Sequence, residues 1–129
     1  MPRSRMITRY TRLYTTADGE TRFDSIDREL MPIEFVSGAP PLFLSESLIA
    51  HNVSFFGAKD GWKSDWHASS GRNLFIVLSG QWEVTSSSAE TRIFAKGDVL
   101  LVEDTTGKGH ISRVVGGEDS IAVLVEMPD

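Results

Sequence analysis

Two histidines stand in segments whose composition suits a binding site. His67 follows Gly61 in a segment rich in tryptophan and polar residues, and His110 ends a second segment that starts at Gly97 and contains two further glycines. Imidazole transfers protons near neutral pH and binds divalent metals. Because an ordinary hairpin pattern separates the two segments, we expect both imidazoles to meet at the mouth of one small barrel.

Three carboxylates lie near these histidines in the sequence. Asp65 shares a strand face with His67 by the period of two, and Glu103 and Asp104 precede His110. One interpretation is a two-histidine, one-carboxylate metal site, in which Asp65, Glu103 or Asp104 completes the set with His67 and His110; Glu103 is the carboxylate ligand that we name. The second is metal-free acid/base catalysis by the two histidines, with Asp65 or Asp104 fixing the tautomer. The third is that each histidine is a hydrogen-bonded wall residue without chemistry.

Further residues are candidates for contacts with a substrate. Asn73 and Phe75 share the inward face of the strand after the first segment, and Arg72 is the nearest cation, suited to an anionic substrate. Thr105 offers a hydroxyl from the loop before His110. The alternatives are a surface role for Arg72 and a tight connection at residues 103–110 whose acids cap backbone amides.

The three tryptophans invite an interpretation as aromatic surfaces for stacking a ligand. Trp66 alternates with His67, so on a regular strand it faces away from the pocket. Core packing or a subunit interface is therefore the preferred use for Trp66.

Composition narrows the class of protein. The 129 residues allow one domain, and 40% hydrophobic with 24% charged residues is ordinary for a globular chain. A net charge of −5, with the basic residues scattered, argues against nucleic acid as a partner. Without cysteine, any metal must be held by nitrogen and oxygen. No segment reads as a signal peptide or a membrane span, so we expect no membrane partner and a cytoplasmic location.

Short runs of β-branched and aromatic residues predict an all-β fold. We expect strands at 74–78, 81–85, 91–94, 99–102, 110–115 and 121–127. The less regular N-terminal part allows strands at 7–15, 21–23, 33–36 and 53–56, and one helical turn at 27–30. We therefore predict a single domain over residues 1–129, with N-terminal strands or an arm at 1–50 and a barrel or jelly-roll core at 51–129.

The spacing of the first segment resembles a motif of the cupins, a family of small jelly-roll barrels. The usual first cupin motif is a glycine, five residues, His-x-His, three or four residues, Glu, six residues and Gly. The matching positions here are Gly61, His67, Ser69, Asn73 and Gly80.

The second segment resembles the other cupin motif, which is a glycine, five residues, Pro-x-Gly, two residues, His, three residues and Asn. The matching positions are Gly97, Glu103, Gly107, His110 and Val114, with two residues inserted between Glu103 and Gly107. Residues 81–96 separate the motifs, which is a usual cupin interval. The resemblance covers residues 61–127 and implies a cupin-type jelly-roll β-barrel.

The resemblance also implies expectations about metal and partners. Typical cupins hold a divalent metal with three histidines and a glutamate, and only His67 and His110 carry over as strong ligands, because Ser69 and Asn73 replace the other two. The candidates are Fe, Mn, Ni or Zn, or no metal at all. By the same analogy we expect a homodimer, with residues 9–36 crossing to the second subunit.

Two functions follow from this sequence. The first is a small cupin-like enzyme, of isomerase, lyase, cyclase or oxygenase type, that acts on a small organic acid or carbonyl compound with His67 and His110. The second is a non-catalytic sensor or carrier that holds a small ligand without a metal.

Overall fold

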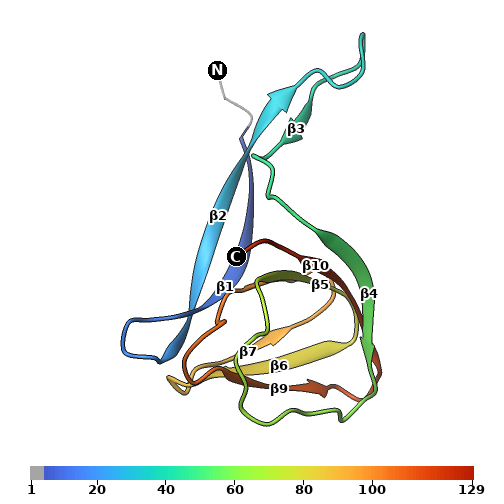
Figure 1. Ribbon diagram of the computed structural model, residues 1–129. Helices are drawn as coiled ribbons and strands as arrows, with labels where there is room; N and C mark the ends of the chain where they lie inside the picture. Colours follow the sequence, from blue (N-terminus) through green and yellow to red (C-terminus); the bar gives the residue numbers. More distant parts are fainter. Residues whose placement is uncertain (1–4) are drawn as a thin grey trace.

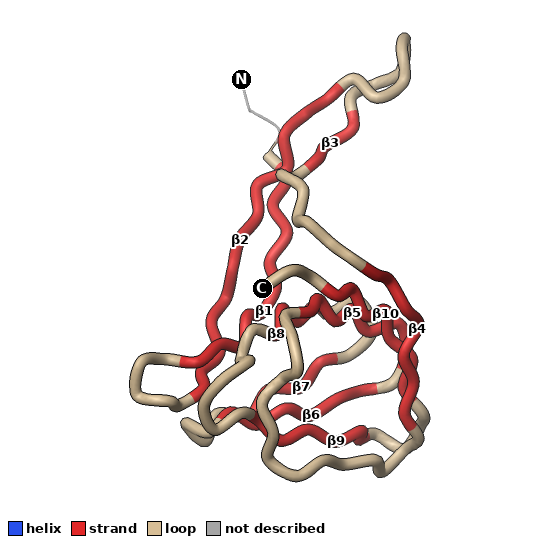
Figure 2. The backbone as a smooth tube through the Cα atoms, viewed as in Figure 1, coloured by secondary structure: helices blue, strands red, loops and turns tan. Residues whose placement is uncertain are grey.

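The computed structural model describes residues 5–129, which fold into β-strands joined by loops (Figures 1 and 2). The ten strands are β1 Met6–Thr15, β2 Thr21–Ile33, β3 Leu42–Leu44, β4 Asn52–Ala58, β5 Asn73–Ser79, β6 Gln81–Ser86, β7 Thr91–Phe94, β8 Val99–Val102, β9 His110–Val115 and β10 Ser120–Glu126. The predicted all-β fold is confirmed. No helix in the described part of the chain is long and apolar enough to span a bilayer.

The helical turn expected at residues 27–30 is wrong. These residues belong to β2, which pairs with β1 over residues 21–30 in an antiparallel register that sets Asp27 opposite Arg9. The guanidinium of Arg9 donates to both carboxylate oxygens of Asp27 across the pair. The local sequence is polar enough for a helix, but ten consecutive strand pairings outweigh that weak preference.

The strands form two sheets that enclose the core. The larger has seven strands in the order β3-β2-β1-β8-β5-β10-β4, and the smaller has three in the order β7-β6-β9. Figure 1 shows β6, β7 and β9 lying below β5 and β10. Between the sheets lies one cluster of buried side chains to which both contribute: Leu13, Phe23, Phe75, Val77, Trp82, Val84, Phe94, Leu100, Val102, Val114 and Ala122.

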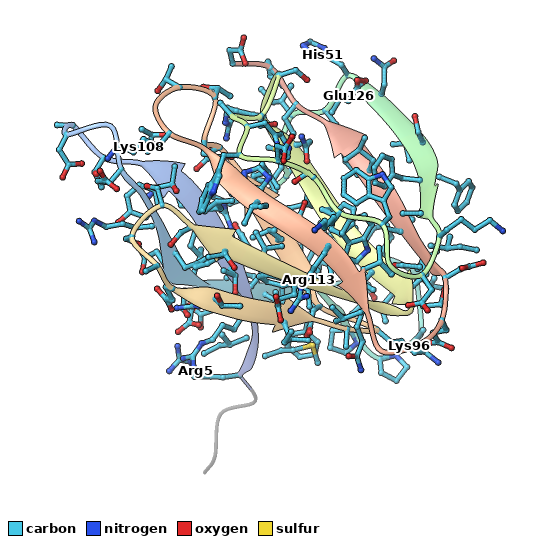
Figure 3. All side chains as sticks on the ribbon, turned by 90° about the horizontal axis from the view of Figure 1, so that it is seen from below. Arg5, His51, Lys96, Lys108, Arg113 and Glu126 are labelled. Carbon is cyan, nitrogen blue, oxygen red and sulfur yellow. The ribbon has the colours of Figure 1, made fainter. Side chains whose placement is uncertain are left out.

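In the smaller sheet, buried and more exposed residues alternate along the central strand β6. In β6, Trp82 and Val84 are buried, while Glu83 between them is only half-buried. Glu83 accepts a hydrogen bond from Arg113 of β9, with Nε and Oε1 2.7 Å apart. Figure 3, seen from below, shows Arg113 on the outside of this sheet. The alternation therefore separates a buried face from a solvated one.

The end of β2 and the short β3 leave the barrel. We call residues 31–49 the arm. It contains the pairing of Met31, Pro32 and Ile33 with β3. Figures 1 and 2 show this end of the larger sheet projecting upward, away from the region where β5 and β10 lie over β6, β7 and β9. The strand expected at residues 33–36 is not formed, because β2 ends at Ile33.

Candidate functional site

A pocket opens between the two sheets, with a cavity of about 220 Å³. Its walls come from β4, β5, β6, β8, β9, β10 and the loop before β5. Its lining residues are Phe56, Trp62, His67, Ser69, Asn73, Phe75, Trp82, Val84, Leu100, Val102, His110, Ser112 and Leu124.

The two histidines meet at this pocket. His67 and His110 form an isolated antiparallel bridge, in which each backbone N–H donates to the carbonyl of the other residue at 3.0 and 2.9 Å. Their ring centroids are 4.5 Å apart. His110 is buried and His67 is exposed at the mouth. The predicted convergence of the two imidazoles is confirmed, while their chemical roles stay a prediction.

Gly109 makes this close approach possible. Its φ is +74°, a left-handed conformation, and a Cβ at this position would lie 2.1 Å from the carbonyl oxygen of His67. Any other residue would push the loop that carries His67 away from β9. The glycine before His110 therefore sets the distance between the two histidines.

A carboxylate lies behind His110. Asp104 is fully buried, and its Oδ2 is 2.5 Å from Nδ1 of His110. The other oxygen, Oδ1, is buried without a hydrogen-bond partner among the described residues. When Asp104 is ionised, its carboxylate only accepts, and Nδ1 of His110 then carries the proton and donates it to this bond. In neutral His110 the lone pair is therefore on Nε2.

A backbone carbonyl orients His67 in the same way. Nδ1 of His67 lies 2.9 Å from the carbonyl oxygen of Asp65. A carbonyl can only accept, so Nδ1 carries the proton here too, and the lone pair of neutral His67 is on Nε2. The sequence interpretation gave this task to the carboxylate of Asp65. The structure shows that the backbone of Asp65 does it, because the period of two does not apply to a loop residue outside the strands.

Glu103 is not a partner of the histidines, contrary to its assignment as a ligand. Its carboxylate accepts hydrogen bonds from Arg12 at 2.6 Å and from Arg72 at 2.7 Å. Partial burial alone would raise the pKa of Glu103, but the hydrogen bonds and charges of the two arginines outweigh it and hold the pKa below its usual value. The chain just after β8 thus directs Asp104 to His110 and Glu103 to the two arginines.

The candidate substrate contacts divide between pocket and surface. Asn73 and Phe75 line the pocket. Arg72 does not, because its guanidinium is bound to Glu103 and donates to the carbonyl of Pro128 at 2.7 Å. Thr105 is exposed and lies outside the lining. The charge that the sequence interpretation offered to an anionic substrate is thus already neutralised.

Four aromatic residues, Phe56, Trp62, Phe75 and Trp82, belong to the lining of the pocket. Trp82 lies at the centre of the group, with ring centroids 5.3 Å from Phe75, 5.7 Å from Trp62 and 6.1 Å from Phe56. Its indole N–H donates to Ser120 Oγ at 2.7 Å. Trp66 is half-exposed and does not line the pocket. The alternation of residues in β6 predicts that Trp82 faces inward. Nothing in the nearby sequence indicates that Phe56 packs against it.

Comparisons with known proteins bear on the fold. No protein-family model matches the chain, and no curated protein matches it either. Among solved structures, it is similar to an RmlC-like cupin family protein with a double-stranded β-helix fold from Methanocaldococcus jannaschii. That match has 14% identity and a TM-score of 0.50, and it covers 59% of this chain and 68% of the other. The chain has the cupin fold.

Two further solved structures match with lower TM-scores. A Cupin 2 conserved barrel domain protein from Salinispora arenicola is 22% identical, with a TM-score of 0.48 over 59% of this chain and 61% of that one. A conserved protein of unknown function from Streptococcus pyogenes is 23% identical, with a TM-score of 0.46 over 60% and 64%. The matched part thus spans roughly two thirds of these proteins or less.

The residues of this cupin barrel do not fit the usual cupin metal site. Ser69 and Asn73, at two of the usual ligand positions, line the pocket with a hydroxyl and an amide, and Asn73 Nδ2 lies 3.3 Å from the carbonyl of Gly71. Residues 5–129 contain no group of three or more His, Cys, Asp or Glu side chains that could hold a metal. Two imidazoles fall short of the three protein donors that a bound divalent ion generally has.

Proposed function

We propose that the protein is a small cupin enzyme that moves protons on a compact carbonyl compound, with His67 and His110 as its acid/base pair. One observation carries this proposal: two imidazoles face one pocket, and each has its Nδ1 bound to a separate acceptor. Each ring therefore keeps Nε2 for a ligand. General acid/base catalysis of this kind contributes about 10²- to 10⁴-fold in rate.

The surroundings of the two rings differ, and the difference suggests their roles. Asp104 is fully buried with His110 as the hydrogen-bond partner of its side chain. A carboxylate bound to Nδ1 fixes the ring and its tautomer, so we assign the role of acid to His110. His67 is exposed and bonded to a neutral carbonyl. We assign the role of base to His67, whose ring has no carboxylate partner.

The proposed step is enolisation. His67 takes a proton from the carbon next to the carbonyl, and the electrons of that C–H bond form the C=C bond. His110 gives a proton to the carbonyl oxygen, which receives the electrons of the C=O π bond. The product is an enol with no change in oxidation state, and its reprotonation at the same carbon regenerates the ketone with that hydrogen exchanged.

The lining favours an uncharged ligand over the organic acid that the sequence also allowed. None of the described lining residues is Lys or Arg. The cavity of about 220 Å³ exceeds the roughly 150 Å³ that holds benzene in an engineered apolar site. A molecule with one ring, its face against Trp82 and its carbonyl against the histidines, suits this space.

The test is proton exchange of cyclohexanone and acetophenone in deuterated water, followed by NMR. The protein should accelerate exchange at the carbons next to the carbonyl. His67→Ala and His110→Ala should each lower that rate by about 100-fold or more. Ile93→Ala, outside the pocket, is the matched control and should leave the rate unchanged. Full exchange activity in either histidine variant would contradict the proposal.

The alternative is a binding protein without turnover. It is favoured by Ser69 and Asn73, which leave the pocket with neutral polar groups and an apolar wall where a metal cupin has ligands. This alternative predicts that the same ketones raise the melting temperature while the exchange rate stays at that of buffer. Elemental analysis of the purified protein would separately reveal a bound metal.

A further inference from the structure

The pocket has polar side chains that the proposed enolisation does not use. Its polar lining residues are His67, Ser69, Asn73, His110 and Ser112. The proposed function uses Nε2 of the two histidines and gives no task to the other three. A polar group in a partly buried site needs a hydrogen-bond partner from the protein, from water or from a ligand. The hydrogen bonds of these three side chains therefore indicate what a ligand must offer.

The loop before β5 fixes the orientation of the Asn73 amide. Ser69 Oγ donates its proton to the carbonyl of Gly71 at 2.6 Å, so this Oγ can only accept from a further neighbour. Asn73 Nδ2 lies 3.3 Å from the same carbonyl and 3.4 Å from Ser69 Oγ. Both neighbours accept, so the nitrogen faces them, and Oδ1 has no donor among the described residues. Asn73 thus offers the pocket an acceptor.

Ser112 offers a hydroxyl from the opposite sheet. It is only 9% exposed, and it follows His110 by two residues in β9, so both side chains lie on the same face of that strand. The backbone of Ser112 is bonded to Ser64, whose Oγ accepts from the Ser112 N–H at 3.1 Å. The hydroxyl of Ser112 has no hydrogen-bond partner within residues 5–129. Ser112 is therefore a second donor beside His110.

A second cavity, of about 370 Å³, adjoins the pocket at Asn73. The two cavities share Asn73 and Leu124. The other polar residues of the second cavity are His51, Asn52, Ser70, Arg72, Glu126 and Asp129. Trp82 lines the pocket and not this cavity. A ligand with its ring against Trp82 therefore has polar surroundings for its other end at Asn73.

We propose that the ligand is a hydroxy ketone, whose hydroxyl donates to Asn73 Oδ1 and whose carbonyl accepts from Ser112 as well as from His110. This inference rests on the proposed function, which places the carbonyl at His110. A plain ketone has no donor, so it would leave Asn73 Oδ1 without a partner. A site with a placed hydrogen-bonding group selects the ligand that carries the matching hydroxyl.

The first experiment compares ligands by NMR titration, following the indole N–H signals of Trp62 and Trp82 in the pocket lining. 2-Hydroxycyclohexanone or 4-hydroxycyclohexanone should bind about tenfold more tightly than cyclohexanone, because one hydrogen bond contributes about this factor. The corresponding methoxycyclohexanones keep the oxygen and lose the donor, so they should bind no more tightly than cyclohexanone. Equal affinities for cyclohexanone and both hydroxy ketones, or an equal gain with a methoxy group, would overturn the inference.

The second experiment assigns the two hydrogen bonds to their residues. Asn73→Leu, of similar size, should abolish the preference for the hydroxy ketone over cyclohexanone. Ser112→Ala should weaken the binding of both ligands by about tenfold, since both carry the carbonyl. Ser69→Ala is the matched control, because it removes a contact of the same loop and keeps Asn73 Oδ1, so the preference should remain.

Three results of the variants would contradict the inference. They are an unchanged preference in Asn73→Leu, unchanged affinities in Ser112→Ala, and loss of the preference in Ser69→Ala, which would assign it to the loop. The titration needs no turnover, so it is independent of the proposed enolisation. The preference without proton exchange supports a hydroxy ketone as the ligand of a binding protein. Proton exchange without the preference contradicts the hydroxy ketone and leaves the roles of His67 and His110 standing.

Discussion

The two sheets of this barrel share one core but differ on their outer faces. The smaller sheet alternates, with Trp82 and Val84 inside and the Glu83–Arg113 ion pair outside. The larger sheet is apolar on both sides across β8, β5 and β10. The comparison shows that alternation of apolar and polar residues along a strand indicates a solvent-exposed outer face.

The largest expected effect comes from removing the central aromatic ring of the smaller sheet. Trp82→Ala should lower the free energy of unfolding by about 3–5 kcal/mol, since it opens a cavity among three aromatic neighbours. Ile93→Ala, on the outer face of the same sheet, should change it by about 0.5 kcal/mol or less. Urea unfolding measures both. Similar losses in the two variants would break the distinction between the inner and outer faces.

A smaller effect is expected at the junction where the His67 loop meets the smaller sheet. Gly109→Ala should cost more than about 2 kcal/mol, because it adds a clash with the carbonyl of His67 to a left-handed backbone. Gly117→Ala shares the positive φ but meets nothing within 4 Å, so it should cost about 1–2 kcal/mol. Urea unfolding gives these costs, and NMR should show the histidine ring signals shifted in Gly109→Ala alone. Equal costs would mean that the close approach at Gly109 is not limiting.

The smallest effect concerns pH and the ion pairs of the two sheets. The pKa of Glu103 is held below its usual value by Arg12 and Arg72. A lowered pKa in the folded state means stability that is present above the ordinary value and is lost as the pH falls below it. Glu103→Gln should therefore unfold at a urea midpoint that falls less than that of the wild type between pH 5 and about pH 3. Glu83→Gln, at an exposed pair, should lower stability by about 0.5 kcal/mol or less at neutral pH. A wild-type midpoint as insensitive to acid as that of Glu103→Gln would contradict this assignment.

Much of the fold was predictable because most of the chain after residue 73 carries strong local signals. Each predicted strand there matches an observed one within a residue, since glycine turns separate short β-branched runs. The helical turn at 27–30 failed because pairing with β1 decides that segment. The N-terminal arm was expected, whereas the isolation of residues 31–49 depends on where β2 ends.

The site was predictable in its centre and not in its periphery. Spacing brought His67 and His110 together, but it did not decide between Glu103 and Asp104. Which of the two carboxylates reaches His110 depends on the tertiary structure. Arg12 and Arg72, which are distant in sequence, donate hydrogen bonds to Glu103. The aromatic group was not predicted for a similar reason, since Phe56 and Trp82 lie in different sheets and meet only because the two sheets pack face to face.

Pocket lining and outer face interleave along the same strands, residue by residue. Phe75 and Leu124 face the cavity, while Ile76 and Val123, their neighbours in sequence, face outward. Substitutions could thus retune ligand choice without disturbing the opposite surface. An insertion of one residue in β5 or β10 would instead exchange the two sets of side chains. Related chains should therefore vary in side-chain identity along these strands and keep their length.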